Sequence, residues 1–186
     1  MTGELRDYPK AFVPRDIAIQ IRSYTRIQWP QLDQWIGDRL WDVPADFPAR
    51  NFVLLDGEKL ISHADANFRP IEHAGETFHV GGLSAVFTYP AYRGQGHAAQ
   101  VVRAATEYLD RNGADLSMLF CGEPLRGFYG SCGWEPIDNA HILCGDRATP
   151  TRHDSGLVMM RFSAEKGRAA KLRFTAEPIY VGDRTW

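Results

Sequence analysis

A glycine-rich loop that begins with an arginine is the part of this sequence best suited to bind an anion. It reads Arg93-Gly94-Gln95-Gly96-His97-Ala98 and lies between an apolar, strand-like run and a helix-like pattern. Glycine has no Cβ, so the backbone of such a loop can approach a bound group closely. The N-terminus of the following helix adds unpaired N–H groups and the positive end of a dipole. We therefore predict that an anion can bind where this loop enters the helix.

Two well-known phosphate-binding patterns fit this loop less well. A Walker loop ends in Gly-Lys-Ser/Thr, and neither Lys nor Ser/Thr follows Gly96. A dinucleotide-binding Gly-x-Gly-x-x-Ala pattern is met by Gly94, Gly96 and Ala99. That pattern also needs an acidic residue at the end of the next strand, about 20 residues on. Asp115 stands near this distance but opens its strand, so the dinucleotide alternative lacks its acidic partner.

Two segments, in this order, resemble the hallmarks of the GNAT superfamily of N-acetyltransferases. Arg93-x-x-Gly96-x-Ala98 is similar to the signature that holds the pyrophosphate of acetyl-coenzyme A (acetyl-CoA) in that superfamily. Phe128-Tyr129-x-x-Cys132-Gly133-Trp134 resembles its second hallmark, an aromatic-Tyr pair before a Gly-aromatic step. The resemblance implies the acyl-CoA N-acyltransferase (GNAT) fold in a single domain over residues 1–186. That fold is α/β, with a mixed, mostly antiparallel central sheet and flanking helices.

The same resemblance assigns acetyl-CoA, as co-substrate, to a defined set of residues. Arg93 is expected to neutralise the pyrophosphate or to pair with the 3′-phosphate. The strand backbone at residues 85–87 is expected to pair with the pantetheine arm, which leaves the N–H of Val86 to polarise the thioester oxygen. The expected coenzyme-binding residues are Ala85, Val86, Phe87, Arg93, Gly94, Gln95, Gly96, His97 and Ala98.

A closer resemblance, from about Asp56 to Trp186, is to the aminoglycoside 2′-N-acetyltransferases. Besides the two motifs, it is carried by Ile61-Ser-His-Ala64, Leu116-Ser117, Thr149-Pro150, Asp154-x-Gly156 and the ending Gly182-Asp183…Trp186. It implies that Tyr129 is the catalytic tyrosine and that Trp186, with its terminal carboxylate, lies near the acceptor amine. One position departs from the group, which carries a catalytic Glu on the central strand where this chain has Ser84.

The implied reaction needs one group that removes a proton and another that supplies one. An alkyl amine has a pKa of about 10, so it arrives protonated and must lose a proton before it attacks the thioester. We expect a water chain, ordered by Ser84, to carry this proton to the Trp186 carboxylate or to Asp183. Tyr129 is the expected acid that protonates the departing thiolate. His63 and His79 lie in expected strands and are interpreted as structural, although either could relay a proton.

Acidic residues are expected around the acceptor, because amine substrates are cationic. Asp42, Asp46 and Asp154 are the candidates for binding it. The missing Glu weakens the case for aminoglycosides, so another small-molecule amine stays open beside them. Two further function classes remain: a non-catalytic acyl-CoA-binding module, which Ser84 favours, and a peptide or protein N-acetyltransferase. Tyr129 and the acidic tail favour the small-molecule enzyme, and the oligomeric state is left open, with a homodimer as one option.

Apolar periodicity and breaker residues define the elements that must position these residues. Helices are predicted over 16–28 with Asp16 as N-cap, over 31–41, over 98–111, from Glu123 over a short stretch, and over 163–171 with Ser163 as N-cap. Strands are predicted in a hairpin around a type I′ Asp56-Gly57 turn, with continuation to Ile71, and over 78–88, 115–121, 134–137, 142–144 and 157–162.

Composition excludes several other classes of function. The chain has 186 residues, a formal net charge of −2 and no run of Lys or Arg, so neither a nucleic-acid partner nor an anionic membrane surface is indicated. No apolar run approaches the ~20 residues of a membrane span, and the first residues lack the apolar stretch of a secretory signal. The three cysteines and six histidines lack metal-type spacing. We therefore expect no metal site, reduced thiols and a cytoplasmic location.

Overall fold

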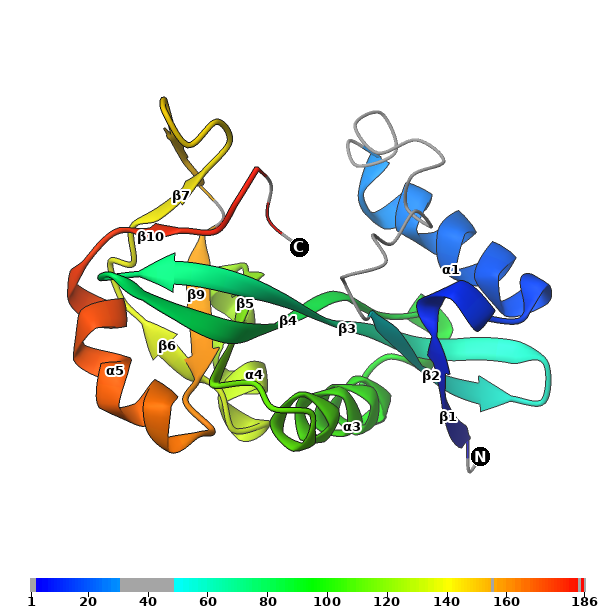
Figure 1. Cartoon of the computed structure of the whole chain (residues 1–186). Helices are drawn as coiled ribbons and strands as arrows, with labels where there is room; N and C mark the ends of the chain where they lie inside the picture. Colours follow the sequence, from blue (N-terminus) through cyan, green and yellow to red (C-terminus); the bar gives the residue numbers. More distant parts are fainter. Residues whose placement is uncertain (1–2, 31–48, 155, 184, 186) are drawn as a thin grey trace. The chain divides into compact units, whose positions relative to one another are not determined.

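The computed structural model describes residues 3–30, 49–154, 156–183 and 185 (Figure 1). Contacts divide the chain into two compact units, each made of separate stretches of sequence. The first unit comprises Met1–Asn67 and Ala85–Thr106, and the second comprises Phe68–Ser84 and Glu107–Trp186. Two strands, β3 (Lys59–His73) and β4 (Glu76–Thr88), therefore contribute one end to each unit, as does the helix α3 (His97–Arg111).

The first unit is built on antiparallel strands. β1 (Glu4–Pro9) pairs along its whole length with β2 (Arg50–Asp56), and β2 pairs with the start of β3. The β2–β3 hairpin predicted from the sequence is confirmed, but its turn type is not. Asp56 pairs with Lys59, so Gly57 and Glu58 occupy the centre of the turn, and of these two Gly57 has a positive φ, of 60°. This is the pattern of a type II′ turn, in which the first central residue is glycine.

Helix α1 (Arg15–Gln28) closes the core of the first unit through one apolar face. Ile17, Ile21 and Tyr24 recur at helical spacing and are buried, whereas Ile19 and Ile27 point away from this face and are exposed. The buried face joins a cluster whose other fully buried members are Val53, Leu55, Leu60 and Phe87. The short helix η1 (Lys10–Phe12) precedes α1, and η3 (Pro90–Tyr92) follows β4.

The second unit holds the strand order β4-β5-β9-β6. β4 pairs in parallel with β5 (Leu116–Cys121), whereas β5 with β9 (Leu157–Arg161) and β9 with β6 (Glu135–Ile137) are antiparallel. A small second sheet has the order β10-β7-β8. Its strands are β7 (Ile142–Cys144), β8 (Thr151–Arg152) and β10 (Ile179–Tyr180). The expected α/β architecture with a mixed, mostly antiparallel sheet and flanking helices is thus confirmed.

Helices η4 (Glu123–Leu125), α4 (Arg126–Ser131) and α5 (Glu165–Ala176) complete the second unit. α5 places Ala170 and Phe174 in a core with strand residues such as Phe78, whose ring meets that of Phe174 edge-on at 5.0 Å. Gly167 brings the helix very close to the sheet. A Cβ on Gly167 would stand 2.0 Å from the carbonyl oxygen of Asp115.

Both helix caps predicted from the sequence are wrong. The N-cap of α1 is Pro14, and Asp16 lies inside the first turn. The N-cap of α5 is Ala164, because the Ser163 hydroxyl instead donates to the carbonyl of Ala114 at 3.1 Å. β8 and β10 were not predicted. The helix predicted over 31–41 lies outside the described residues. None of the helices in the described part of the chain has the length and apolar character that a membrane span requires.

Candidate active site

The loop before α3 has the geometry of an anion cradle. Gly94 and Gly96 adopt positive φ values of 74° and 79°, and a Cβ on either would meet nothing within 4 Å. α3 begins at His97, so the N–H groups of its first turn have no partner inside the helix. The residue His97 is 8 % exposed, and its Nδ1 atom is buried without a hydrogen-bond partner. The loop therefore presents open space, N–H donors and a dipole end at one place.

Arg93 is held beside this loop by two hydrogen bonds within the first unit. Its Nε donates to the carbonyl of Thr88 at 3.1 Å, and its Nη2 donates to the hydroxyl of Tyr24 at 2.7 Å. The Tyr24 ring lies 4.5 Å from Phe87 and 4.4 Å from Tyr89, centroid to centroid. Arg93 thus connects the loop to α1 and to the end of β4, while the residue as a whole stays exposed.

The middle of β4 carries an irregularity that sequence reasoning missed. Ala85 has a φ of 49°, which L-residues seldom adopt. Residues 84–86 are also half-buried, although Val80 to Leu83 before them and Phe87 after them are buried. The parallel ladder to β5 covers just Val80 to Gly82. The strand segment expected to meet the pantetheine arm is therefore the part of β4 that is strained and partly accessible.

Tyr129, the expected acid, is buried in the second unit. It lies on α4 with 6 % of its surface exposed. Burial is the main cause that raises its pKa well above the ordinary value for tyrosine, and the nearby thiols of Cys121 and Cys132 raise it further. Burial also raises the pKa of Cys121. At neutral pH the Tyr129 phenol thus keeps its proton, which is the state that a proton donor needs.

The backbone around Tyr129 is fixed by the end of its helix. The Tyr129 carbonyl accepts hydrogen bonds from the N–H groups of Cys132, at 2.9 Å, and Trp134, at 3.2 Å. Gly133 takes a positive φ of 88° there. The Phe128 ring meets the Tyr129 ring edge-on, with 4.8 Å between centroids. The Phe-Tyr…Gly-Trp motif thus forms a short helix with a glycine stop.

The remaining predicted site residues fall on separate elements or outside the described part. Ser84 lies half-buried on β4. Asp154 is exposed in the loop before β9, and Asp183 is exposed after β10. Asp154 lies beside His153. Burial lowers the pKa of His153, and the charge of Asp154 opposes this shift without cancelling it. Asp42, Asp46 and Trp186 lie outside the described residues, so their roles stay predictions.

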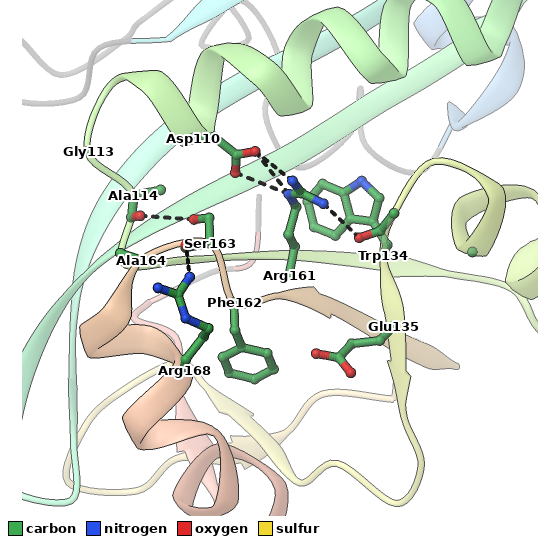
Figure 2. A pocket seen from close by; sticks show the side chains of 12 residues that line it. Asp110, Gly113, Ala114, Trp134, Glu135, Arg161, Phe162, Ser163, Ala164 and Arg168 are labelled. Carbon is green, nitrogen blue, oxygen red and sulfur yellow. Dashed lines mark hydrogen bonds and ion pairs between the residues drawn. The ribbon is translucent and has the colours of Figure 1, made fainter.

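A cavity of about 720 Å³ in the second unit contains none of the predicted catalytic, coenzyme-binding or substrate-binding residues (Figure 2). It lies among the C-terminal end of α3, the segment from α4 to β6 and the segment from β9 to α5. Arg161 donates to both carboxylate oxygens of Asp110, at 2.9 to 3.2 Å, and to the carbonyl of Gly133. Lys171 pairs with Glu135 at 2.6 Å. The charged side chains of its wall thus have partners within the protein.

Two histidines of the predicted strands have partners within the protein. Among the described residues, no group of three or more His, Cys, Asp or Glu side chains is placed to hold an ion. His63 and His79, which the sequence places in strands, each have a ring nitrogen bonded to a backbone carbonyl, that of Ala85 and that of Gly113, each at 2.8 Å. Both histidines therefore have structural contacts, as expected.

A model of the acetyltransferase (GNAT) domain matches residues 5–137 of the chain. No similar sequence was found among curated proteins. Among solved structures, a GNAT family N-acetyltransferase (YhbS) from Escherichia coli in complex with CoA matches with a TM-score of 0.63 and 20% identity, over 97% of this chain and 89% of that one. An acyl-CoA N-acyltransferase from Pseudomonas aeruginosa matches with a TM-score of 0.59 and 16% identity, over 86% and 99%.

A third structure, a protein of Enterococcus faecalis described as a probable N-acyltransferase, matches with a TM-score of 0.59 and 18% identity. The match covers 74% of this chain but 33% of that longer chain. At these identities the similarity concerns the fold. It confirms the fold expected from the two motifs and leaves the resemblance to aminoglycoside 2′-N-acetyltransferases unconfirmed.

Proposed function

The chain belongs to the acetyltransferase (GNAT) domain family, and we propose that it moves the acetyl group of acetyl-CoA to a primary amine of a small molecule. The observation that carries this proposal is the open loop before α3. Positive φ at Gly94 and Gly96, free space above them and the first N–H groups of the helix fit a pyrophosphate. The buried, unpartnered Nδ1 of His97 adds a polar atom next to these groups.

The residues present fit the coenzyme through backbone as well as side-chain groups. The N–H groups of residues 95–98 hold the pyrophosphate, and Arg93, braced by Tyr24 and Thr88, adds positive charge beside it. The backbone of residues 85–87 pairs with the pantetheine arm, and the N–H of Val86 polarises the thioester oxygen. Acetyl-CoA supplies an activated acyl group and a thiolate that can leave.

Two proton movements are assigned to this chain's own side chains. The acceptor ammonium loses its proton to a water ordered by Ser84, and that proton passes on to the carboxylate of Asp183 or of Trp186. The Tyr129 hydroxyl gives its proton to the departing sulfur. The raised pKa of Tyr129 supports this assignment, because the phenol stays protonated until it meets a strong base such as a desolvated thiolate.

The acceptor is a cationic small molecule, with an aminoglycoside-like amine as one class. Asp154 and Asp183 are exposed carboxylates that can attract it, and Asp42 and Asp46 complete the proposed acidic set. A second candidate function, a non-catalytic acyl-CoA-binding module, is favoured by one observation: Ser84 stands where the resembling group carries its basic Glu.

Thiol release from acetyl-CoA against a panel of amines tests the proposal and separates the two candidates. The panel contains aminoglycosides, polyamines, amino acids and a lysine peptide. We expect release with one small-molecule class. Calorimetric binding of acetyl-CoA without release from any amine would favour the binding module, and release with the lysine peptide alone would favour a protein substrate.

Gly96→Ala is expected to weaken acetyl-CoA binding by about 10- to 100-fold, since hydrogen bonds to charged groups contribute about 1.5–3 kcal/mol. The new methyl group fills the space in which the pyrophosphate would sit. Gly75→Ala is the matched control. Gly75 has a φ of 77°, close to the 79° of Gly96, and also has nothing within 4 Å of a Cβ. Both variants carry similar backbone strain, so calorimetry should show a changed Kd in Gly96→Ala alone. Equal Kd values in the two variants would remove this loop from the coenzyme site.

A further inference from the structure

The left-handed conformation of Ala85 needs something to hold it. Ala85 is the one residue among the described parts of β4 that combines a side chain with a positive φ. Such a conformation persists where surrounding contacts impose it, and it is common at functional sites. Ala85 itself carries just a methyl group, so its side chain cannot supply these contacts. The contacts must come from its backbone.

His63 on β3 supplies that contact. Its Nδ1 lies 2.8 Å from the carbonyl oxygen of Ala85, and the residue is 1 % exposed. Its ring lies 5.1 Å from that of Phe87, centroid to centroid, which restricts how the imidazole can turn. In a regular sheet a backbone N–H of the neighbouring strand bonds such a carbonyl. At Ala85 a buried side chain bonds the carbonyl.

Asn51 selects the imidazole tautomer that this contact requires. Burial lowers the pKa of His63, so the ring is neutral and carries one proton. A carbonyl cannot donate, so this proton lies on Nδ1, and Nε2 must accept a hydrogen bond. Nε2 lies 2.9 Å from the Oδ1 atom of Asn51, and in this orientation of the amide the buried Nδ2 atom of Asn51 has no hydrogen-bond partner. Exchanging the amide N and O satisfies both groups, because Nδ2 then donates to Nε2.

The Ala85 carbonyl and the Val86 N–H belong to one peptide unit. The peptide bond is planar and trans, so its C=O and N–H point in opposite directions. Any group that fixes the direction of the Ala85 oxygen therefore also fixes the direction of the Val86 N–H, which points away from His63. Val86 is half-buried, so this N–H lies in the accessible part of β4.

We propose that His63, oriented by Asn51, is a positioning residue that aims the Val86 N–H at the oxygen of the bound thioester. His63 acts through the Ala85 carbonyl and does not touch the substrate. This inference rests on the proposed acetyl transfer, since it assigns the role of the oxyanion donor to Val86. It also makes a prediction about the backbone that does not depend on activity.

Ser62 provides a matched control from the same strand. Its hydroxyl donates to the carbonyl of Phe87 at 2.8 Å and contacts the hydroxyl of Thr88 at 2.8 Å. Like His63, it is buried and binds a β4 carbonyl through its side chain. Ser62→Ala therefore removes a comparable hydrogen bond two residues beyond Ala85, without releasing the peptide unit that carries the Val86 N–H.

The test compares His63→Leu, His63→Gln and Ser62→Ala. NMR coupling constants and carbon shifts of Ala85 report its φ in each protein, and steady-state kinetics with acetyl-CoA report the reaction. We expect His63→Leu to lose the positive φ and to lower kcat by about 10- to 100-fold, as misplaced oxyanion donors do. We expect KM for acetyl-CoA to change less than about threefold, because the pyrophosphate loop stays intact. His63→Gln can still donate to Ala85, so it should recover much of kcat.

A second arm uses Ala85→Gly as a background. Glycine reaches positive φ unaided, so His63→Leu should reduce kcat less in this background than in the native one. A retained positive φ and native kcat in His63→Leu, or an equal loss in Ser62→Ala, would overturn the proposal. If His63→Leu does not fold, a folded His63→Gln in which Ala85 leaves the left-handed region overturns it as well. Loss of the positive φ in His63→Leu, beside a wild type that neither binds acetyl-CoA nor releases thiol, would reject the proposed function but keep the role of His63 in the backbone.

Discussion

Replacing Tyr129 by Phe is expected to lower kcat for acetyl transfer by about 10²- to 10⁴-fold, the usual contribution of a positioned general acid. The substitution removes one oxygen atom and keeps the ring that packs against Phe128. The proposed coenzyme site consists of the loop before α3 and of β4, so the Kd of acetyl-CoA should stay near the wild-type value. Rapid-mixing kinetics of thiol release, with calorimetry of acetyl-CoA binding, measure the two quantities separately.

Tyr180→Phe is the matched control for the loss of a phenolic hydroxyl. Tyr180 donates to the carbonyl of Gly145 at 2.6 Å, far along the chain from α4. Losing this bond should cost about 1 kcal/mol of folding free energy and leave kcat unchanged. If Tyr129→Phe lowers kcat no more than Tyr180→Phe does, Tyr129 is a structural residue and the thiolate leaves without its help.

The expected pH dependence of kcat also follows from Tyr129. Because the pKa of Tyr129 is raised above its ordinary value, the phenol remains protonated through neutral and moderately alkaline pH. The donor form is therefore present throughout, and kcat should show no alkaline decline due to this group below about pH 10. An alkaline limb near pH 8 that disappears in Tyr129→Phe would contradict the role assigned to the buried phenol.

Gly167→Ala is expected to lower the free energy of unfolding by about 2–4 kcal/mol, at the upper end of what overpacking costs. The new Cβ would stand 2.0 Å from the Asp115 carbonyl oxygen and 2.8 Å from its carbon. Both are backbone atoms, so no side-chain rotation can relieve the contact. α5 would have to move off the sheet, which would open the core around Phe174. Urea unfolding, followed by tryptophan fluorescence, measures the shift of the midpoint.

Gly127→Ala is the opposite case and serves as the control. Gly127 is also helical, on α4, but a Cβ there meets nothing within 4 Å. In such a place alanine should stabilise the protein by about 0.4–1 kcal/mol, because it reduces the freedom of the unfolded chain. The same Gly→Ala change is thus expected to lower the free energy of unfolding at Gly167 and to raise it at Gly127. A Gly167→Ala protein as stable as the wild type would show that α5 is not seated as described.

The strand, loop and helix around residues 78–111 could be predicted from the sequence because their signals are local. A long apolar run, two glycines and a 3.6-residue period each point to one structure. The N-cap of α5 could not be predicted, because a tertiary contact takes the hydroxyl that would cap the helix. Ser163 looks like an N-cap, yet its hydroxyl serves the Ala114 carbonyl, which lies far away in the sequence.

The candidate site likewise has some features that could be predicted from the sequence and others that could not. The loop at residues 93–98 and Tyr129 could be proposed from the sequence because their motifs are short and contiguous. The distortion at Ala85 has no such signal, since alanine has no preference for positive φ and the contact that holds it comes from His63, which lies 22 positions earlier in the chain. The strands β8 and β10 have two residues each, too few for any periodicity to appear.

The way in which the chain alternates between its two compact units limits how the protein can be divided. The backbone passes from one unit to the other after Asn67, after Ser84 and after Thr106. A cut after Ser84 divides both units, and a cut after Asn67 or after Thr106 divides one of them, so no single cut releases two fragments that each contain a complete hydrophobic core. The units are therefore not interchangeable modules: a gene fusion that joined one half of this protein to half of a relative would recombine partial cores. Chimeras of this family member should succeed when whole strands and their partners are exchanged together, and fail when the exchange follows the linear order of the sequence.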